Sequence, residues 1–193
     1  MRVVAGSAGR LSLSAPRGLD VRPTMDKVRA ACFDSLGGRV AGARVADLFA
    51  GSGAVGIEAL SRGAARADFV ESDRRALDCI RENLERAGLA ASARVVERDV
   101  PRFLRAAAQA GECYDLVYAD PPYAGRGGCA DYLPLLLGAA GLRPLLAAGG
   151  LAMIECPASQ RLPEAAGWRL LRDRKYGRSR VIQLAPDSGK VEA

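Results

Sequence analysis

From residue 44 onward, short apolar runs alternate with stretches in which apolar residues recur at helical spacing. Buried strands are predicted at residues 45–50, 67–71, 94–98, 114–119 and 151–155. Helices are predicted between them: one ends at residue 60, and the others cover residues 73–88, 101–110 and 132–137. The helix that opens at Asp73 has the clearest pattern, because it has one apolar face and is closed by Gly88. Such alternation predicts an α/β fold, in which helices cover both faces of a mostly parallel sheet.

The N-terminal end departs from this alternation. Residues 1–22 are predicted to form a short hairpin, with strand-like residues on either side of the turn-rich segment 6–9. A helix capped by Thr24 is expected to follow the hairpin and to end at Gly37.

The C-terminal part predicts antiparallel pairing. Residues 168–173 and 178–184 are strand-like, and they flank the tight turn at Gly177. We therefore expect an antiparallel edge on an otherwise parallel sheet. Residues 185–193 are expected to be a disordered tail outside the domain.

The composition excludes several kinds of chemistry. The chain has 193 residues, enough for one domain with a sizeable core, and it contains no histidine. A Ser-His-Asp triad, a Cys-His dyad and a histidine-ligated zinc site are therefore excluded. The five cysteines form no Cys-x-x-Cys pair and their number is odd, which argues against a paired metal site and a disulfide framework. Since no long apolar run is present, we expect a cytoplasmic protein with no membrane partner. The missing histidine and unpaired cysteines predict no metal site, and a monomer is the default expectation.

Charge is unevenly distributed along the chain, whose formal net charge is +6. Residues 1–44 carry eight basic and three acidic side chains, and residues 169–193 carry seven and three. Residues 45–168 are mildly acidic, with 13 basic and 16 acidic side chains. Two basic ends favour a polyanionic partner, although 25 of the 28 basic residues are Arg, as a GC-rich genome alone would produce. The candidate contacts to such a partner are Arg2, Arg10, Arg17, Arg178 and Arg180.

A glycine-rich segment follows the first predicted strand. Gly51, Gly53 and Gly56 match the Gly-x-Gly-x-x-Gly pattern of nucleotide-binding loops, and ligands of such sheets bind at the carboxyl ends of the strands. The carboxylate of Asp47, near the end of the strand, discriminates between cofactors. At roughly 4–6 Å it would repel each pyrophosphate charge by about 1–4 kcal/mol, whereas it would attract the ammonium and sulfonium of S-adenosylmethionine (SAM). The sequence therefore predicts SAM as the cofactor.

Two further acids stand at the ends of the next predicted strands. Glu71 ends the second strand and can accept hydrogen bonds from a pair of ribose hydroxyls. Asp99 follows the third strand and can accept a hydrogen bond from the exocyclic amine of adenine, with a helix cap or a solvated loop carboxylate as the alternative. The candidate cofactor-binding residues at these strand ends are Asp47, Phe49, Ala50, Gly51, Gly53, Glu71, Ser72, Asp99, Val100 and Asp120.

The motif Asp120-Pro121-Pro122-Tyr123 follows the fourth predicted strand. Two consecutive prolines cannot continue a strand, and they fix a stiff extended turn. Such a turn can present the carboxylate of Asp120 and the carbonyl of Pro121 as two acceptors for the hydrogens of an exocyclic amine, whose lone pair then faces the methyl group of SAM. Tyr123 can stack on the presented base. These four residues are therefore the candidate catalytic group, and a rigid surface turn is the alternative.

The motif at residues 120–123 resembles the Asp/Asn-Pro-Pro-aromatic motif of the SAM-dependent amino methyltransferases. Further segments are similar to one family, the bacterial small-subunit ribosomal RNA (guanine-N2) methyltransferases, known as the methyltransferase D family. These segments are residues 2–11, 18–29, 47–53, 56–63 and 175–177. The similarity extends in order from residue 1 to about residue 184.

The resemblance implies a Rossmann-like SAM-dependent methyltransferase domain at residues 23–184, with a mostly parallel seven-stranded sheet and an RNA-binding hairpin extension at residues 1–22. It implies that the product is a guanine of 16S ribosomal RNA methylated at N2, and that the partner is this RNA in an assembling 30S subunit. It also implies that Arg22 and Thr24 lie at the methionine end of the cofactor. Relatives often have Glu-His after the fifth strand, where this chain has Glu-Cys156, so any RNA contact made by that histidine would be lost.

The residues alone leave other assignments open. One is an amino methyltransferase for adenine or cytosine in DNA, or for a protein glutamine. DNA enzymes usually carry a target-recognition domain, for which 193 residues leave no room, and a glutamine enzyme would not need basic ends. Another is an inactive RNA-binding module with the same fold, which would have no use for the two acceptors at Asp120 and Pro121. A nicotinamide-dependent dehydrogenase is disfavoured by the carboxylate of Asp47.

Overall fold

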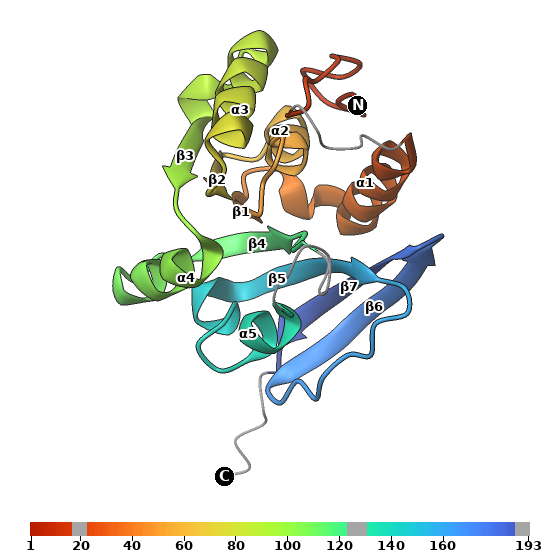
Figure 1. Ribbon diagram of the computed structural model, residues 1–193, viewed down its shortest axis with the longest axis vertical. Helices are drawn as coiled ribbons and strands as arrows, with labels where there is room; N and C mark the ends of the chain where they lie inside the picture. The colour runs from red at the N-terminus through yellow and green to blue at the C-terminus, as the bar shows by residue number, and fades with distance from the viewer. Residues whose placement is uncertain (17–22, 123–130, 188–193) are drawn as a thin grey trace. The chain divides into compact units, whose positions relative to one another are not determined.

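The computed structural model describes residues 1–16, 23–122 and 131–187 (Figure 1). The chain divides into two compact units, Met1–Phe103 and Leu104–Ala193, and each is described by itself. Helix α4, Val100–Gln109, runs across this division. Among the described residues, no helix is long and apolar enough to cross a membrane.

The first unit contains three strands that pair in parallel in the order β3-β2-β1. Its strands are β1 (Arg44–Leu48), β2 (Arg66–Glu71) and β3 (Ala93–Glu97). Its helices are α1 (Pro23–Leu36), α2 (Ala54–Ser61) and α3 (Arg74–Ala87), with short 3-10 turns η1 (Gly37–Val40) and η2 (Ala90–Ser92). The alternation of strands and helices follows the sequence prediction closely.

Helix α3 shows why the sequence pattern was informative. The Asp73 side chain caps the helix by accepting a hydrogen bond from the backbone N–H of Ala76, at 3.0 Å. Gly88 ends it in the left-handed conformation, with φ of 67°. Leu77 and Ile80 are fully buried, so the predicted apolar face is the one that packs on the sheet.

The N-terminal segment, defined here as residues 1–16, forms less regular structure than the predicted hairpin. Its two arms meet in one antiparallel bridge between Arg2 and Ser12, with further backbone bonds on either side. The rest of the predicted hairpin, residues 17–22, lies outside the described residues. Helix α1 already begins at Pro23, so Thr24 lies in its first turn and the prediction that Thr24 caps the helix was wrong. Proline is favoured there because its fixed φ suits the first helical position.

The second unit combines parallel and antiparallel pairing. Its strand order is β4-β5-β7-β6, with β4 and β5 parallel and the pairs β5–β7 and β7–β6 antiparallel. Its elements are β4 (Tyr114–Ala119), α5 (Leu133–Leu137), the 3-10 turn η3 (Arg143–Leu145), β5 (Leu146–Pro157), β6 (Trp168–Tyr176) and β7 (Ser179–Pro186).

Several strand boundaries in this unit differ from the prediction, among them the start of β5 and the ends of β6, at Tyr176, and of β7. Strand β5 begins at Leu146, so Gly149 and Gly150 lie inside it and do not precede it. The strand continues through the glycines because the β4–β5 ladder shifts register between Tyr114 and Leu116. Strand β7 extends to Pro186, so the first two residues of the predicted tail at 185–193 belong to the sheet, while residues 188–193 lie outside the described part.

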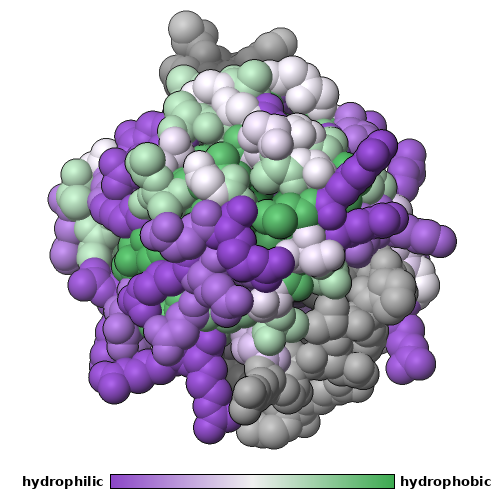
Figure 2. Space-filling model, turned by 90° about the horizontal axis from the view of Figure 1, so that it is seen from above, coloured by the Kyte–Doolittle hydropathy of each residue, from purple (hydrophilic) through white to green (hydrophobic). Residues whose placement is uncertain are grey.

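The predicted fold class is confirmed: the strands form a mostly parallel seven-stranded sheet with an antiparallel C-terminal edge. Core side chains come from both kinds of element, as the buried Phe69 of β2 and Ile57 of α2 illustrate. In the space-filling view, hydrophilic side chains cover much of the face that is shown, with apolar ones between them (Figure 2).

Candidate functional site

The glycine loop, residues 49–53, connects β1 to α2 and has an unusual backbone conformation. Phe49, Gly51 and Gly53 all have positive φ, at 60°, 57° and 76°. Glycine adopts this region readily, whereas Phe49 does so only at an energetic cost that the surrounding contacts must offset. Backbone of this kind, without side chains at Gly51 and Gly53, lets a ligand approach the main chain closely.

Gly56, the third glycine of the pattern, serves packing between α2 and β2. A Cβ atom added there would lie 2.3 Å from the ring of Phe69, a distance that real Cβ atoms do not show. Since Phe69 is fully buried, the first turn of α2 can rest on β2 only if residue 56 has no side chain.

Asp47 is buried beneath the glycine loop. Its carboxylate Oδ2 accepts a hydrogen bond from the backbone N–H of Gly56, at 2.9 Å, and only 2% of the residue is exposed. The side chain therefore fastens the strand to the first turn of α2, a role that sequence reasoning did not assign to it. Its predicted contact with the ammonium of SAM stays a prediction.

Burial sets the protonation of Asp47. Loss of hydration raises the pKa of its carboxyl from 3.8 to about 7, and the nearby negative charge of Glu71 adds to the rise. The hydrogen bond from Gly56 and the positive charge of Arg29 act in the opposite direction. The carboxyl of Glu71 thus lies near enough to Asp47 to disfavour the ionised form of Asp47.

Glu71, the last residue of β2, binds the glycine loop from the neighbouring strand. Its Oε2 accepts the backbone N–H of Gly51 at 2.9 Å. Its Oε1 accepts the backbone N–H groups of Ser72 and Asp73, at 2.7 and 2.9 Å. Glu71 ends the second strand, as predicted, and its binding of ribose hydroxyls stays a prediction.

Asp99 adopts the alternative that the sequence left open, a helix cap. Its Oδ1 accepts the backbone N–H of Arg102 at 2.9 Å, and its Oδ2 lies 3.3 Å from the Arg102 guanidinium. Val100, the first residue of α4, is buried. The side chain of Asp99 remains partly exposed, and its contact with adenine stays a prediction.

Asp120 and Pro121 belong to the second unit, directly after β4. Asp120 is half-buried, Pro121 is buried and Pro122 is exposed, so this turn presents the aspartate at the end of the strand. Tyr123 and Arg22 lie outside the described residues, and the side chain of Thr24 is not described. The roles proposed for these residues therefore stay predictions.

Cys156, which was expected to follow the fifth strand, lies within β5 and is buried. Only 1% of Cys156 is exposed, and burial raises the pKa of its thiol to about 11, so it is uncharged at neutral pH. Its neighbour Glu155 accepts a hydrogen bond from the hydroxyl of Tyr118, at 3.2 Å.

The predicted polyanion contacts differ in exposure and in their partners within the chain. The guanidinium of Arg180 forms a two-bond ion pair with Asp173 and also donates to the carbonyl of Gln160. Arg180 is therefore a structural ion-pair partner within the sheet. Arg2, Arg10 and Arg178 are exposed, and Arg17 lies outside the described residues.

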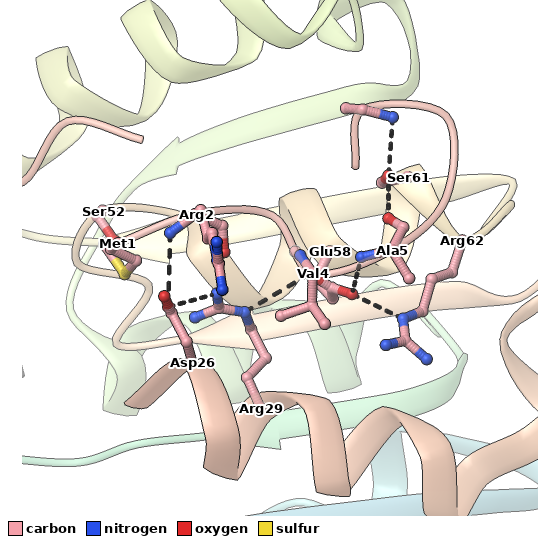
Figure 3. Close-up of polar contacts among 12 residues, drawn as sticks. Met1, Arg2, Val4, Ala5, Asp26, Arg29, Ser52, Glu58, Ser61 and Arg62 are labelled. Atoms are coloured by element: carbon pink, nitrogen blue, oxygen red, sulfur yellow. Dashed lines mark hydrogen bonds and ion pairs between the residues drawn. The ribbon is translucent and has the colours of Figure 1, made fainter. Parts of the chain in front are cut away.

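Sequence reasoning missed a set of buried polar side chains beside the glycine loop. Glu58 of α2 and Asn83 of α3 have no exposed surface, and Arg29 and Ser61 are nearly as deeply buried. All four bind the backbone of the N-terminal segment or of the loop. Figure 3 shows Glu58, Arg29 and Ser61 beside the segment. The available signal was their position: Glu58 and Asn83 interrupt apolar faces where the helical spacing calls for a hydrophobic residue.

The sheet order and the alternation of strands and helices are those of the Rossmann-like methyltransferase fold. A putative methyltransferase from Escherichia coli has a similar structure, with a TM-score of 0.77 and 34% sequence identity over 96% of this chain and 97% of its own. Within this class, the chain belongs to the family described as conserved hypothetical protein 95, whose model matches residues 1–184.

Two named relatives agree with this assignment. The ribosomal RNA small subunit methyltransferase D of Escherichia coli K12 is 36% identical over 178 residues, which cover 92% of this chain and 85% of that protein. The putative rRNA methyltransferase YlbH of Bacillus subtilis 168 is 43% identical over 123 residues, which cover 64% and 67% of the two chains. The resemblance to the methyltransferase D family is thereby confirmed.

Proposed function

We propose that this chain transfers the methyl group of SAM to the N2 amine of a guanine in 16S ribosomal RNA, with the RNA in an assembling 30S subunit. Membership of the family supports the class of reaction, and the names of the two relatives, both rRNA methyltransferases, support the class of substrate. The residue-level support comes from the glycine loop for the cofactor and from Asp120 and Pro121 for the amine.

The observation that carries the cofactor assignment is the pair of carboxyl groups at the glycine loop. Asp47 and Glu71 each accept a backbone N–H of the segment that follows β1, and the negative charge of Glu71 disfavours ionisation of the Asp47 carboxyl. A pyrophosphate would add negative charge where two acids already oppose it, whereas a cationic cofactor would relieve the repulsion. SAM, which carries an ammonium and a sulfonium, fits this site and supplies the methyl group when it is bound.

The chain's own contribution to the reaction is orientation of the amine. The carboxylate of Asp120 and the carbonyl of Pro121 each accept a hydrogen bond from the guanine N2 amine. These two hydrogen bonds turn the nitrogen lone pair toward the methyl carbon. The new bond joins nitrogen and carbon, the bond between carbon and sulfur breaks, and the nitrogen then loses a proton to water or to Asp120. No histidine is required for these steps, and the chain has none.

The RNA contacts we propose are exposed arginines at both ends of the chain. Arg2 and Arg10 belong to the N-terminal segment, and Arg178 follows β6. Strand β6 adds a row, named here the β6 arginines: Arg169, Arg172 and Arg174.

The register of β6 explains why these three side chains form a row. They pair with Ala185, Gln183 and Val181 of β7, which alternate along that strand, so all three arginines lie on one face of the sheet. All are exposed, and the guanidinium of Arg174 also donates to the carbonyl of Asp173 at 3.4 Å. Strand β6 is the last in the strand order, so its arginines are accessible to phosphate groups.

Methyl transfer to defined substrates tests the proposal. The protein is incubated with SAM labelled at the methyl group and, in parallel, with 30S subunits that lack the modification, a 16S ribosomal RNA transcript, duplex DNA, or a protein extract free of ribosomes. Label in the RNA of the subunits is the expected result. Label confined to DNA or protein, or an affinity for NAD above that for SAM, would refute it.

A further inference from the structure

The N-terminal segment is attached to the first unit through buried charged groups. The fully buried carboxylate of Glu58 accepts the backbone N–H of Val4 at 2.6 Å and that of Ala5 at 3.1 Å (Figure 3). Arg29, which is 3% exposed, donates to the carbonyl of Arg2. Burial of a charged group costs its hydration free energy. The hydrogen bonds between these two side chains and the backbone of the segment offset part of that cost.

The tip of the segment lies directly on helix α2. The hydroxyl of Ser61 accepts the backbone N–H of Ala8 at 2.9 Å and donates to the carbonyl of Ala5 at 2.6 Å. A Cβ atom on Gly6 would lie 1.8 Å from the Ser61 carbonyl oxygen, so the two backbones are in direct contact. This end of the segment is distant in sequence from the glycine loop, and its contacts do not involve the loop.

Asn83 makes a different kind of attachment, because it binds the segment and the glycine loop at the same time. Its Oδ1 accepts the backbone N–H of Ser14 at 2.8 Å, and its Nδ2 donates to the carbonyl of Ser14 at 3.0 Å. The same Nδ2 donates to the carbonyl of Ser52, also at 3.0 Å. Ser52 stands between the two left-handed glycines of the loop. One fully buried amide therefore connects the two backbones.

From these contacts we infer that the N-terminal segment is part of the cofactor site, with Asn83 as the positioning residue that ties it to the glycine loop. A second contact supports this, since the Ser52 hydroxyl donates to the sulfur of Met1 at 3.7 Å (Figure 3). The loop has three residues in the left-handed region, a conformation that neighbouring contacts must maintain. Loss of the Asn83 amide would leave the Ser52 carbonyl and both Ser14 backbone groups without this partner.

Equilibrium binding of SAM and of its product, S-adenosylhomocysteine, tests the inference. Asn83→Leu, which removes all three bonds, should weaken both ligands about tenfold, and Asn83→Asp, which keeps the acceptor for Ser14, should have a smaller effect. At saturating SAM the rate of methyl transfer should return close to the wild-type value, so the change falls on KM. Ser61→Ala is the matched control, because it removes two buried bonds to the segment at a distance from the loop.

If Asn83 were only structural, Asn83→Leu and Ser61→Ala would lower the melting temperature alike, and neither would change ligand affinity. That result would overturn the inference. It differs from failure of the proposed function, which would appear as absence of SAM binding by the wild-type protein.

A measurement on the wild-type chain avoids dependence on folded variants. The ligand and the segment would both stabilise the glycine loop. S-adenosylhomocysteine should therefore slow hydrogen exchange at the amides of Ser14 and Leu13 by about the same factor as at the amides of the loop. Exchange at the amides of Ser7 and Ala8, at the tip of the segment on α2, should change less. Equal exchange with and without the ligand at Ser14 would contradict the inference.

Discussion

The carboxylate of Asp47 accepts a hydrogen bond from the backbone N–H of Gly56, nine residues later, and this bond at 2.9 Å spans the whole glycine loop. Asp47 lies in β1 and Gly56 in the first turn of α2, so the bond fixes the ends of the loop relative to each other. The side chain does this while buried, which raises the pKa of the carboxyl to about 7. Its protonation therefore changes within the physiological range.

The raised pKa of Asp47 predicts a pH-dependent loss of stability. In the unfolded chain the carboxyl loses its proton near pH 3.8, whereas the folded protein keeps it until about pH 7. Unfolding between these values releases a proton, so this group's contribution to stability decreases as pH rises from about 4 to 7. Asp47→Asn keeps an acceptor for Gly56 and should remove that decrease. In the wild-type protein the decrease in the free energy of unfolding should be at most about 4 kcal/mol. Urea unfolding of both proteins at pH 5, 6, 7 and 8 measures it, and parallel curves would contradict the assignment.

The same carboxyl predicts how SAM binding depends on pH. If the ionised Asp47 binds the ammonium of SAM, the affinity of the wild-type protein should increase as pH rises through about 7, and Asp47→Asn should be weaker and flat over that range. Calorimetric titrations in two buffers of different ionisation enthalpy would also detect release of a proton on binding. An affinity that is independent of pH in the wild-type protein would exclude contact between this carboxylate and the cofactor.

The contact between Gly56 and Phe69 predicts that even one added methyl group is harmful. Gly56→Ala should destabilise the protein by about 1–3 kcal/mol, because the buried ring of Phe69 must move and the first turn of α2 with it. SAM affinity should fall as well. Gly38→Ala is the control, since a Cβ atom there meets nothing within 4 Å. Thermal unfolding of the two variants compares them, and equal melting temperatures would show that α2 does not pack on β2 as described.

The β6 arginines and Arg180 predict opposite effects on RNA binding. Replacement of the three β6 arginines by Gln should reduce the slope of log affinity against log salt by about 2, because about three phosphate contacts are lost. Arg180→Gln should leave the slope unchanged, since its guanidinium is bound to Asp173. A charge-matched control replaces Arg105, Arg161 and Lys175, all exposed in the same unit. If this control lowered the slope as much as the β6 variant did, the row on β6 would have no special role.

Much of the fold could be predicted because its elements follow local rules. The period of the apolar residues in α3 and the capping residues Asp73 and Gly88 fixed that helix within one residue. Strand β5 was predicted too short because two consecutive glycines usually mark a turn, whereas here a register shift in the neighbouring ladder accommodates them. That shift depends on tertiary pairing, which local sequence does not encode.

In the candidate site, too, local sequence predicted some features and tertiary packing decided the others. The sequence located the acids at the strand ends, and the bond between Glu71 and Gly51 agrees with that placement. It did not indicate that Asp47 would bind Gly56, because the direction of a buried side chain is set by the packing around it. Asn83 could have been suspected from a polar residue on an apolar helical face, but its two partners, Ser14 and Ser52, lie 69 and 31 residues away in the chain.

If Asp120 and Pro121 orient a guanine amine for methylation, nucleoside mass analysis should detect the methylated guanine and its loss in a variant. Unmodified 30S subunits are incubated with SAM and either wild-type protein or Asp120→Ala, and SAM binding is measured in parallel. The account predicts N2-methylguanosine with the wild-type protein, a rate lower by about 10²–10³ for the variant, and SAM affinities that agree within about threefold. Methylation of a different base, or an undiminished rate in the variant, would contradict it.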